Sequence, residues 1–502
     1  MAVSHQWFVQ WSAPPLLLTD ISSRYNNVNE RWKTENPQWS GDWGIPEQSD
    51  DKVKYYSNRD NYIEHNKYGR VNNRFKNDDR NGAKGITLWL AMLGIASTQT
   101  IPADIDTPPF NTLYKWKEVD FDFPSPRLRK MALASRKYVP ANVLPLGLEV
   151  WGSRVWVTIP SWRHGVPATL ATVSRAGGET SPLLKPYPDW SFHRLFSNSK
   201  NCSGLTSVFR LSADTCGRLW VLDSGQIDSQ DDPKQLCPPS IVVFDLTTDK
   251  LIARYPIPDK YVLESSLFAN LIIDTRTKYC SDLHIYIADT WRFGLLVFRE
   301  RDQRFWRFSH PYFYPDPLAS NFTLHGFNFQ WTDGIFGLAL TPLDAFRERI
   351  LIFHPMSSYR EFYVSTKVLR DPSLVNSSAI EFNLLGESRG LLGQSSASAM
   401  DRRGIMYYGL VTQDSIGCWN INEPYQKHKL GVVAQNSETL IFPNDIKVDQ
   451  EVKQNVWVIS NRLPIYQAGP LDSNDYNYRI MYADIEEAVR GSVCDPNADL
   501  SD

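Results

Sequence analysis

The stretch "NDIKVDQEVKQNVWVIS" (444–460) places two short apolar runs on either side of a polar turn, directly after an Asn-Asp pair. The stretches "VFRLSADTCGRLWVLDSG" (208–225) and "NLIIDTRTKYCSDLHIYIADT" (270–290) have much the same form. Each reads as a strand, a turn and a second strand. A unit of this kind that recurs along a chain is the sign of a repeat architecture.

Six such units can be laid out, each a hairpin followed by further strands, with a period of roughly 50–70 residues. Runs such as "IVVFDL" (241–246) are apolar on both faces, as expected of a strand that lies between two neighbouring sheets. We therefore predict an all-β chain that forms a six-bladed β-propeller over 105–494, with a short tail at 495–502. The isolated strand candidate "YKWKEVDFDF" (114–123) could pair into the last blade and close the ring. The units cover 146–174, 205–258, 270–310, 329–366, 395–420 and 442–487.

The first hundred residues have another character. Residues 1–79 are polar and Asn-rich without apolar periodicity, which predicts a disordered N-terminal extension. Residues 80–100, "RNGAKGITLWLAMLGIASTQT", resemble a signal peptide, with basic residues, an apolar run and small residues in order. A signal peptide belongs at the N-terminus, so 1–79 reads as a gene-model artefact. The alternative is a cytoplasmic tail before a short signal anchor.

Composition points to a soluble globular protein. The 502 residues are 42% hydrophobic and 22% charged, and the formal net charge is −3. A chain this close to neutral lacks the basic face that a nucleic-acid partner requires. The apolar run at 80–100 is too short to span a bilayer comfortably, so we expect no stable membrane anchor. The sequence does not predict the oligomeric state.

Six cysteines occur without any C-x-x-C spacing, which speaks against a zinc or thioredoxin-type site. Two disulfides are expected among the first four, although the sequence alone does not reveal their pairing; buried thiols are the alternative. Three N-x-S/T sequons support a secreted, extracellular glycoprotein. The disulfide candidates are Cys202, Cys216, Cys237 and Cys280, and the glycosylation candidates are Asn201, Asn321 and Asn376.

Polar residues stand at the ends of the repeated hairpins, whose first strands we expect to line a central channel. In a propeller, loops at one face build the pocket, so these residues are ligand candidates. Their oxygens suit an amine or a metal ion, but Asp and Asn also cap turns and bind backbone amides. The candidates are Asp223, Asp289, Gln413, Asp414, Asn444, Asp445, Asn461, Arg462 and Leu463.

Common catalytic patterns are missing from the sequence. There is no G-x-S-x-G, P-loop, G-x-G-x-x-G or H-E-x-x-H pattern. His325 in "TLHGFNF" is the histidine of interest, as a structural residue or as a base. No catalytic residue, metal ligand set or cofactor is predicted from these residues.

At several long motifs the chain resembles the yellow / major royal jelly protein family of insects. The motifs include "GRLWVLDSG" (217–225), "IYIADTWRFGLLVF" (285–298) and "VWVISNRLP" (456–464), and the likeness runs from about 114 to 494. The resemblance implies a secreted, glycosylated six-bladed propeller with disulfides early in the domain. It also implies a pocket at Asn444, Asn461 and Leu463, where amine-binding relatives carry Thr and Phe in place of Asn444 and Leu463. Without the aromatic ring, stacking worth about 1 kcal/mol would be lost.

The resemblance implies a role in cuticle pigmentation or melanin formation. On this hypothesis the channel binds a small aromatic amine or catechol-derived ligand and possesses, if it is catalytic, a dopachrome isomerase or tautomerase activity. One alternative is a calcium-dependent lactonase or esterase that uses Asn444 and Asp445. Another is a structural cuticle or eggshell protein without a small ligand.

Overall fold

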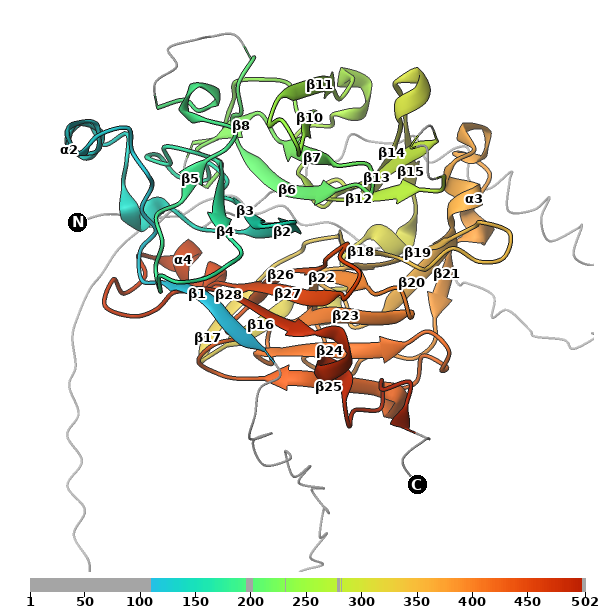
Figure 1. The fold of residues 1–502 in the computed structure, drawn as a ribbon. Coiled ribbons are helices and arrows are strands. Elements are labelled where there is room, and N and C mark those ends of the chain that lie inside the picture. Colours follow the sequence, from blue (N-terminus) through green and yellow to red (C-terminus); the bar gives the residue numbers. More distant parts are fainter. Residues whose placement is uncertain (1–109, 196–201, 231, 278–279, 281, 499–502) are drawn as a thin grey trace, which may run out of the picture. The chain divides into compact units, whose positions relative to one another are not determined.

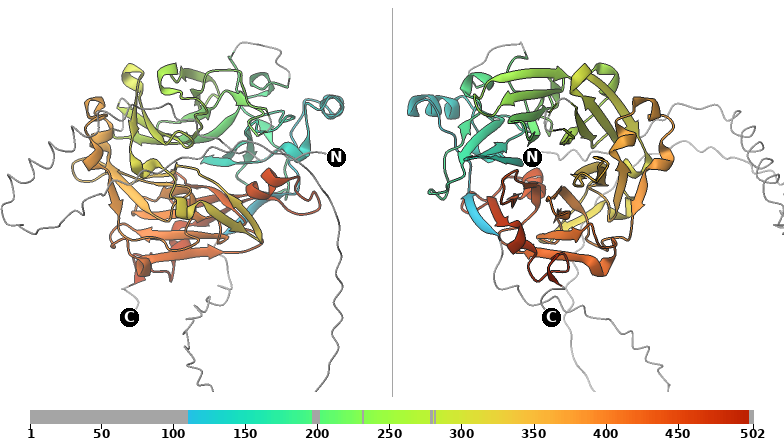
Figure 2. Two further views of the ribbon diagram at one scale, coloured as in Figure 1. Left: turned by 180° about the vertical axis from the view of Figure 1, so that it is seen from behind. Right: turned by 45° about the vertical axis from the view of Figure 1, so that its right-hand side comes forward.

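The computed structural model describes residues 110–498, apart from 196–201, 231, 278–279 and 281. The predicted extension at 1–79 and the signal-like segment at 80–100 lie outside the described residues. In the described part, six four-stranded antiparallel sheets follow one another in chain order around a ring (Figure 1; right-hand view of Figure 2). The predicted six-bladed propeller is therefore confirmed.

Each blade runs from an innermost to an outermost strand, and the first strand of each repeated hairpin is the innermost. The first three blades contain β2 (Gly147–Trp151), β3 (Arg154–Thr158), β4 (Leu170–Ser174) and β5 (Lys185–Pro186); β6 (Val208–Ala213), β7 (Arg218–Asp223), β10 (Ser240–Asp245) and β11 (Leu251–Pro256); and β12 (Phe268–Thr275), β13 (Leu283–Asp289), β14 (Gly294–Arg299) and β15 (Arg304–Ser309). The last three contain β18 (Ile335–Leu340), β19 (Ile350–Pro355), β20 (Glu361–Ser365) and β21 (Asn383–Leu385); β22 (Ser395–Met400), β23 (Ile405–Leu410), β24 (Ser415–Asn420) and β25 (Leu430–Gln435); and β26 (Pro443–Val448), β27 (Asn455–Ser460), β28 (Tyr478–Asp484) and β1 (Asn111–Trp116).

The ring closes through a strand from the beginning of the described chain. Strand β1 pairs antiparallel with β28, so the outermost strand of the sixth blade comes from the opposite end of the propeller sequence. This confirms the predicted closing strand, although the strand begins and ends earlier than the expected range of 114–123. On the inside, β2 lies against both β6 and β26, so the inner strands also form a closed circle.

Strand β13 shows why the repeated strands are apolar on both faces. All seven of its residues are buried. Ile285 and Ile287 pack into the core shared with the second blade, whereas Tyr286 and Ala288 pack into the core shared with the fourth blade. Because successive side chains of a strand point to opposite faces, each middle strand contributes to two cores.

An aspartate follows or ends the inner strand in several hairpins and fixes its turn. Asp214 accepts the backbone N–H groups of Cys216 and Arg218, and its second oxygen accepts the indole N–H of Trp220 at 2.9 Å. Asp449 holds the indole of Trp457 in the same way, at 2.9 Å. These turn aspartates are buried structural residues that each hold a large aromatic ring of the next strand.

Two short hairpins and four helices lie outside the blades. The hairpins are β8 (Gln226–Ile227) with β9 (Lys234–Gln235), and β16 (Asn321–Leu324) with β17 (Phe327–Gln330); the helices are α2 (Pro126–Ala134), α3 (Thr366–Leu369), α4 (Leu463–Ala468) and α5 (Ile485–Val489). Among the described residues, none of these helices is long and apolar enough to cross a membrane.

Candidate functional site

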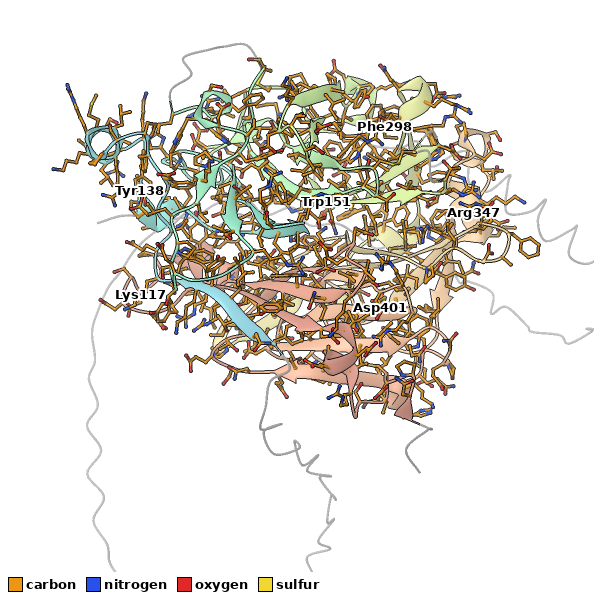
Figure 3. All side chains as sticks on the ribbon, in the orientation of Figure 1. Lys117, Tyr138, Trp151, Phe298, Arg347 and Asp401 are labelled. Carbon is orange, nitrogen blue, oxygen red and sulfur yellow. A yellow bond between two sulfur atoms is a disulfide. The ribbon has the colours of Figure 1, made fainter. Side chains whose placement is uncertain are left out.

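A cavity of about 410 Å³ lies on the axis of the ring, and residues of all six inner strands line it. We call it the axial cavity. Its lining comes mainly from the C-terminal ends of the inner strands, such as Thr275 of β12 and Val448 of β26, and from the turns beyond them. Asp401, labelled in Figure 3, borders it from the turn after β22. The volume is within the range of small-molecule sites.

Glu149 is a residue of the axial cavity whose carboxyl group is buried and has a raised pKa. It sits in the middle of β2, is only 5% exposed, and accepts the backbone N–H groups of Val150 at 2.9 Å and Ala213 at 3.0 Å. Burial raises its pKa to about 7, although the charge of Lys447 and the two N–H groups act in the opposite direction. A carboxyl group that titrates near neutral pH can both accept and donate a proton.

Arg210 lies on the inner strand β6 beside Asp445, which lines the axial cavity. Its side chain is fully buried, and its guanidinium donates to the side-chain oxygen of Asn444 at 2.6 Å and to the Asn444 carbonyl at 3.1 Å. Its Nε lies 3.5 Å from Asp445, and its charge lies 5.6 Å from the ring centre of Phe336. Arg210 thus joins the inner strands of the second, fourth and sixth blades across the axis.

Gly147 makes room for this arrangement. A Cβ at this position would lie 3.0 Å from both the Arg210 side chain and the Asp445 carboxylate, and 2.9 Å from the hydroxyl of Thr158. Such contacts are too close for an ordinary side chain, so β2 can approach the ion pair only with glycine there.

Of the residues predicted from the sequence, Asn444 and Asp445 come together at the axis. Asp445 borders the axial cavity and accepts the backbone N–H groups of Leu148 at 3.0 Å and Ile446 at 3.0 Å. Asn444 is bound by Arg210. Their oxygen atoms are therefore already engaged within the protein, and a role in ligand binding stays a prediction.

Four more of the predicted residues lie at or just after the end of the second strand of a hairpin, beside the start of the inner strand, which is also the end where Asn444 stands. Asn461 donates to the Pro145 carbonyl at 2.8 Å and accepts from the Leu463 backbone at 3.1 Å, while Leu463 packs into the apolar core. Asp223 and Asp289 fix the segments that lead into the inner strands. Asp223 accepts three backbone N–H groups, and Asp289 accepts from Leu267 and from Arg307. The structure gives these residues structural contacts, and their ligand role also stays a prediction.

An aromatic cluster occupies the end of the inner strands that lies away from the axial cavity. We define it as Trp162, Phe209, Phe322, Trp331 and Phe442, which belong to one apolar core. Trp162 lies 5.6 Å from Phe209, and Trp331 lies 5.7 Å from both Phe322 and Phe442, measured between ring centres. Phe322 comes from the β16–β17 hairpin, which thereby packs against residues at the start of β6 and before β26.

His325, the histidine of interest in the sequence, lies at the tip of this hairpin. Its Nε2 is 2.7 Å from the carboxylate of Asp414, and its side chain is 36% exposed. Asp414 follows β23, so the pair connects the hairpin to the fifth blade. Burial raises the pKa of Asp414, and the neighbouring His325 acts against that shift.

Three disulfides cross-link the propeller. They are Cys202–Cys237, Cys216–Cys280 and Cys418–Cys494. The first two confirm that the four early cysteines form two bridges, and the third was not expected. Asn321 and Asn376 are exposed, whereas Asn201 lies outside the described residues.

No group of three or more His, Cys, Asp or Glu side chains in the described ranges is placed to hold a metal ion. Sequence reasoning did not identify Glu149 or Arg210. Both stand in the middle of otherwise apolar strand patterns, "GLEVW" (147–151) and "VFRLSA" (208–213). A charged residue that interrupts a strand buried on both faces is the signal that could have found them.

Comparison with known proteins gives a consistent result. A family model described as major royal jelly protein matches residues 206–494. A Drosophila melanogaster protein named dopaminechrome tautomerase is 43% identical over 391 residues, which covers 77% of this chain and 84% of that protein. Protein yellow of Drosophila pseudoobscura pseudoobscura is 38% identical over 420 residues, covering 83% and 73%. Protein yellow of Drosophila melanogaster is 40% identical over 385 residues, covering 76% and 70%.

Proposed function

Because the chain belongs to the major royal jelly protein family, with yellow and dopaminechrome tautomerase among its relatives, we propose that it tautomerises a catechol-derived aminochrome during pigment formation. The axial cavity binds the substrate, and Glu149 transfers the proton. The protein acts outside the cell, for which its three disulfides are suited. Asn321 and Asn376 are available there for glycosylation.

The observation that carries this proposal is the buried carboxyl group of Glu149 in a cavity of suitable size. Tautomerisation of an aminochrome moves a proton from a ring carbon to an oxygen, without oxidation or reduction. The reaction requires a positioned acid or base whose pKa lies near the working pH. Glu149, with a pKa raised to about 7 by burial, has this property.

Glu149 also has a structural role, because its two oxygens accept backbone N–H groups from β2 and β6. Asp445 has the same role between β26 and β2, so the two carboxylates form a matched pair. Glu149→Gln removes one acceptor and should cost about 1–3 kcal/mol of stability, whereas Asp445→Asn also leaves the buried Arg210 without its anion and should cost about 3–5 kcal/mol. A loss of activity specific to Glu149 can therefore be separated from a loss of stability.

The test compares the full chain, Glu149→Gln and Asp445→Asn for the conversion of dopaminechrome, followed by absorbance, with thermal unfolding recorded for each protein. We expect Glu149→Gln to lower kcat/KM by roughly 10²–10⁴-fold. Asp445→Asn should retain activity to within about tenfold, a smaller loss than that from removing a proton-transfer group. A folded Glu149→Gln variant with full activity would show that another group transfers the proton.

A further inference from the structure

Lys447, like Glu149, is a charged residue of the axial cavity that has no salt-bridge partner among the described residues. It lies on the inner strand β26, two residues after Asp445, so both side chains leave the strand on the same face. It borders the cavity and is half-buried. Within the described part of the chain its ammonium group makes no hydrogen bond and no salt bridge.

The remaining charged residues around the cavity are held by other groups of the protein. Asp214 binds Arg218 at 2.7 Å, Asp401 binds Arg403 at 2.8 Å, and Arg349 lies 3.3 Å from Asp274. Arg402 donates to backbone carbonyls of the turn after β26, and Asp445 faces Arg210. Among the described lining residues, Glu149, Arg402 and Lys447 are thus without a salt-bridge partner, and of the two cations only Lys447 also makes no hydrogen bond.

We propose that Lys447 is a catalytic residue: its ammonium group binds the substrate oxygen on which negative charge develops while Glu149 removes the proton from carbon. This inference rests on the proposed tautomerase function. It restricts the substrate to a conjugated carbonyl compound whose acidic C–H bond and receiving oxygen reach the neighbouring inner strands β2 and β26. A cation at a developing oxyanion is among the largest contributions to catalysis.

The step is balanced without a co-reactant. The C–H bond breaks, its proton passes to Glu149, and the electron pair moves through the conjugated ring to the oxygen beside Lys447. The oxyanion then takes a proton from solvent, and Glu149 returns its proton to solvent. Nothing is oxidised or reduced, as a tautomerisation requires.

Lys447 also acts on Glu149 directly. The groups that face Glu149 are Lys447 and Asp445 on β26 and the backbone N–H groups of Val150 and Ala213. The charge of Lys447 lowers the pKa of Glu149, and that of Asp445, which Arg210 neutralises in part, raises it. Removal of the Lys447 charge should therefore move the ionisation of Glu149 to higher pH, whereas a lysine that only packs against the wall would not affect it.

The experiment measures kcat and KM for dopaminechrome between pH 5 and 9 in the full chain, Lys447→Met, Lys447→Arg and Glu149→Gln. Lys453→Met serves as the control, because Lys453 lies in the same β26–β27 hairpin with a side chain that is 79% exposed. We expect Lys447→Met to lower kcat by roughly 10²-fold with little change in KM, as for the loss of one oxyanion-binding group. The acidic limb of its pH profile should move to higher pH, Lys447→Arg should restore both properties in part, and Lys453→Met should match the unaltered protein.

Two outcomes would overturn the inference in different ways. If Glu149→Gln is inactive while Lys447→Met keeps both its kcat and its pH profile, then the site stands and the role of Lys447 is wrong. If folded Glu149→Gln is fully active, or the unaltered chain does not convert dopaminechrome, then the proposed function fails together with the inference.

Discussion

The two ends of the inner strands differ sharply, although the same six strands build both. At their C-terminal ends lies the axial cavity, where Glu149 and Lys447 are without salt-bridge partners among the described residues. At the other end the aromatic cluster is packed, and the β16–β17 hairpin covers part of it. A propeller can thus concentrate its packing at one end of the axis and leave reactive groups at the other.

Arg210 marks the boundary between these two regions. It is anchored by Asn444 and Asp445 on one side and by the ring of Phe336 on another. Fully buried charges of this kind are tolerated only when they are paired and hydrogen-bonded.

The largest decrease in stability should come from a change at Arg210, the boundary between the two regions. Arg210→Met leaves the carboxylate of Asp445 buried without its cation, and loss of one partner of a buried ion pair costs about 3–5 kcal/mol. Denaturant unfolding should show this loss of stability. The double variant Arg210→Met with Asp445→Asn should recover part of it, and an unchanged midpoint in the single variant would contradict the pairing.

Loss of the disulfide at the rim of the axial cavity should give the second largest decrease in stability. Cys216 and Cys280 lie in neighbouring turns at the cavity end and enclose 64 residues, so replacing both with serine should cost about 3–4 kcal/mol. The KM for dopaminechrome should rise as well, because Thr215 and Thr275 beside these turns line the cavity. Replacement of Cys202 and Cys237, at the other end of the hairpin, is the matched control and should leave KM unchanged.

The buried carboxyl group should give a pH-dependent effect on stability. The pKa of Glu149 is raised from 4.5 to about 7 on folding, so the unfolded chain loses this proton first as pH rises. The stabilising contribution of Glu149 is complete below about pH 4.5 and is lost as pH rises through about 7, a change of roughly 3 kcal/mol.

The measurement is the free energy of unfolding of the unaltered chain minus that of Glu149→Gln, taken at pH 4 and pH 8. Asp333, whose pKa burial raises to about 6, changes in the same direction but is present in both proteins and cancels. We expect the difference to fall between the two pH values. A difference that stays constant would mean that Glu149 ionises as it does in the unfolded chain.

The smallest effect should come from the aromatic cluster. Phe322 is fully buried and stacks on Phe329 at 5.3 Å, so Phe322→Leu should cost about 1–2 kcal/mol through lost ring contacts. Turnover of dopaminechrome should change less than twofold. A large increase in KM would instead place the ligand at this end of the axis, near Asn461 and Leu463, as the sequence resemblance implies.

The fold could be predicted because the pattern that produces it, a hairpin of apolar strands, recurs along the sequence. Strands buried on both faces must be apolar throughout, and the six copies of the hairpin show this pattern. The closing strand was also predictable as an unpaired strand candidate before the first blade, but its limits were not. Pairing with β28 fixes the limits of β1, and the local sequence carries no information on that partner.

The site could be predicted only in part. Asn444 and Asp445 were found because they precede a recognisable strand, yet the sequence does not show that Arg210 binds both. Glu149 was missed because its importance comes from burial, which raises its pKa, and from Lys447 on a strand that is far away in the sequence but adjacent in the fold. Asp223 and Asp289 have the residue types of a ligand site, but backbone N–H groups and arginines already occupy their oxygens.

The pairing of β1 with β28 has a consequence for how the molecule is made. During synthesis β1 emerges before any complete blade, and its partner emerges only after five blades have been produced. Until then β1 is an unpaired strand that leaves Tyr114 and Trp116 uncovered, and neighbouring chains could recruit it. Nearly the whole propeller must therefore be synthesised before the ring can close.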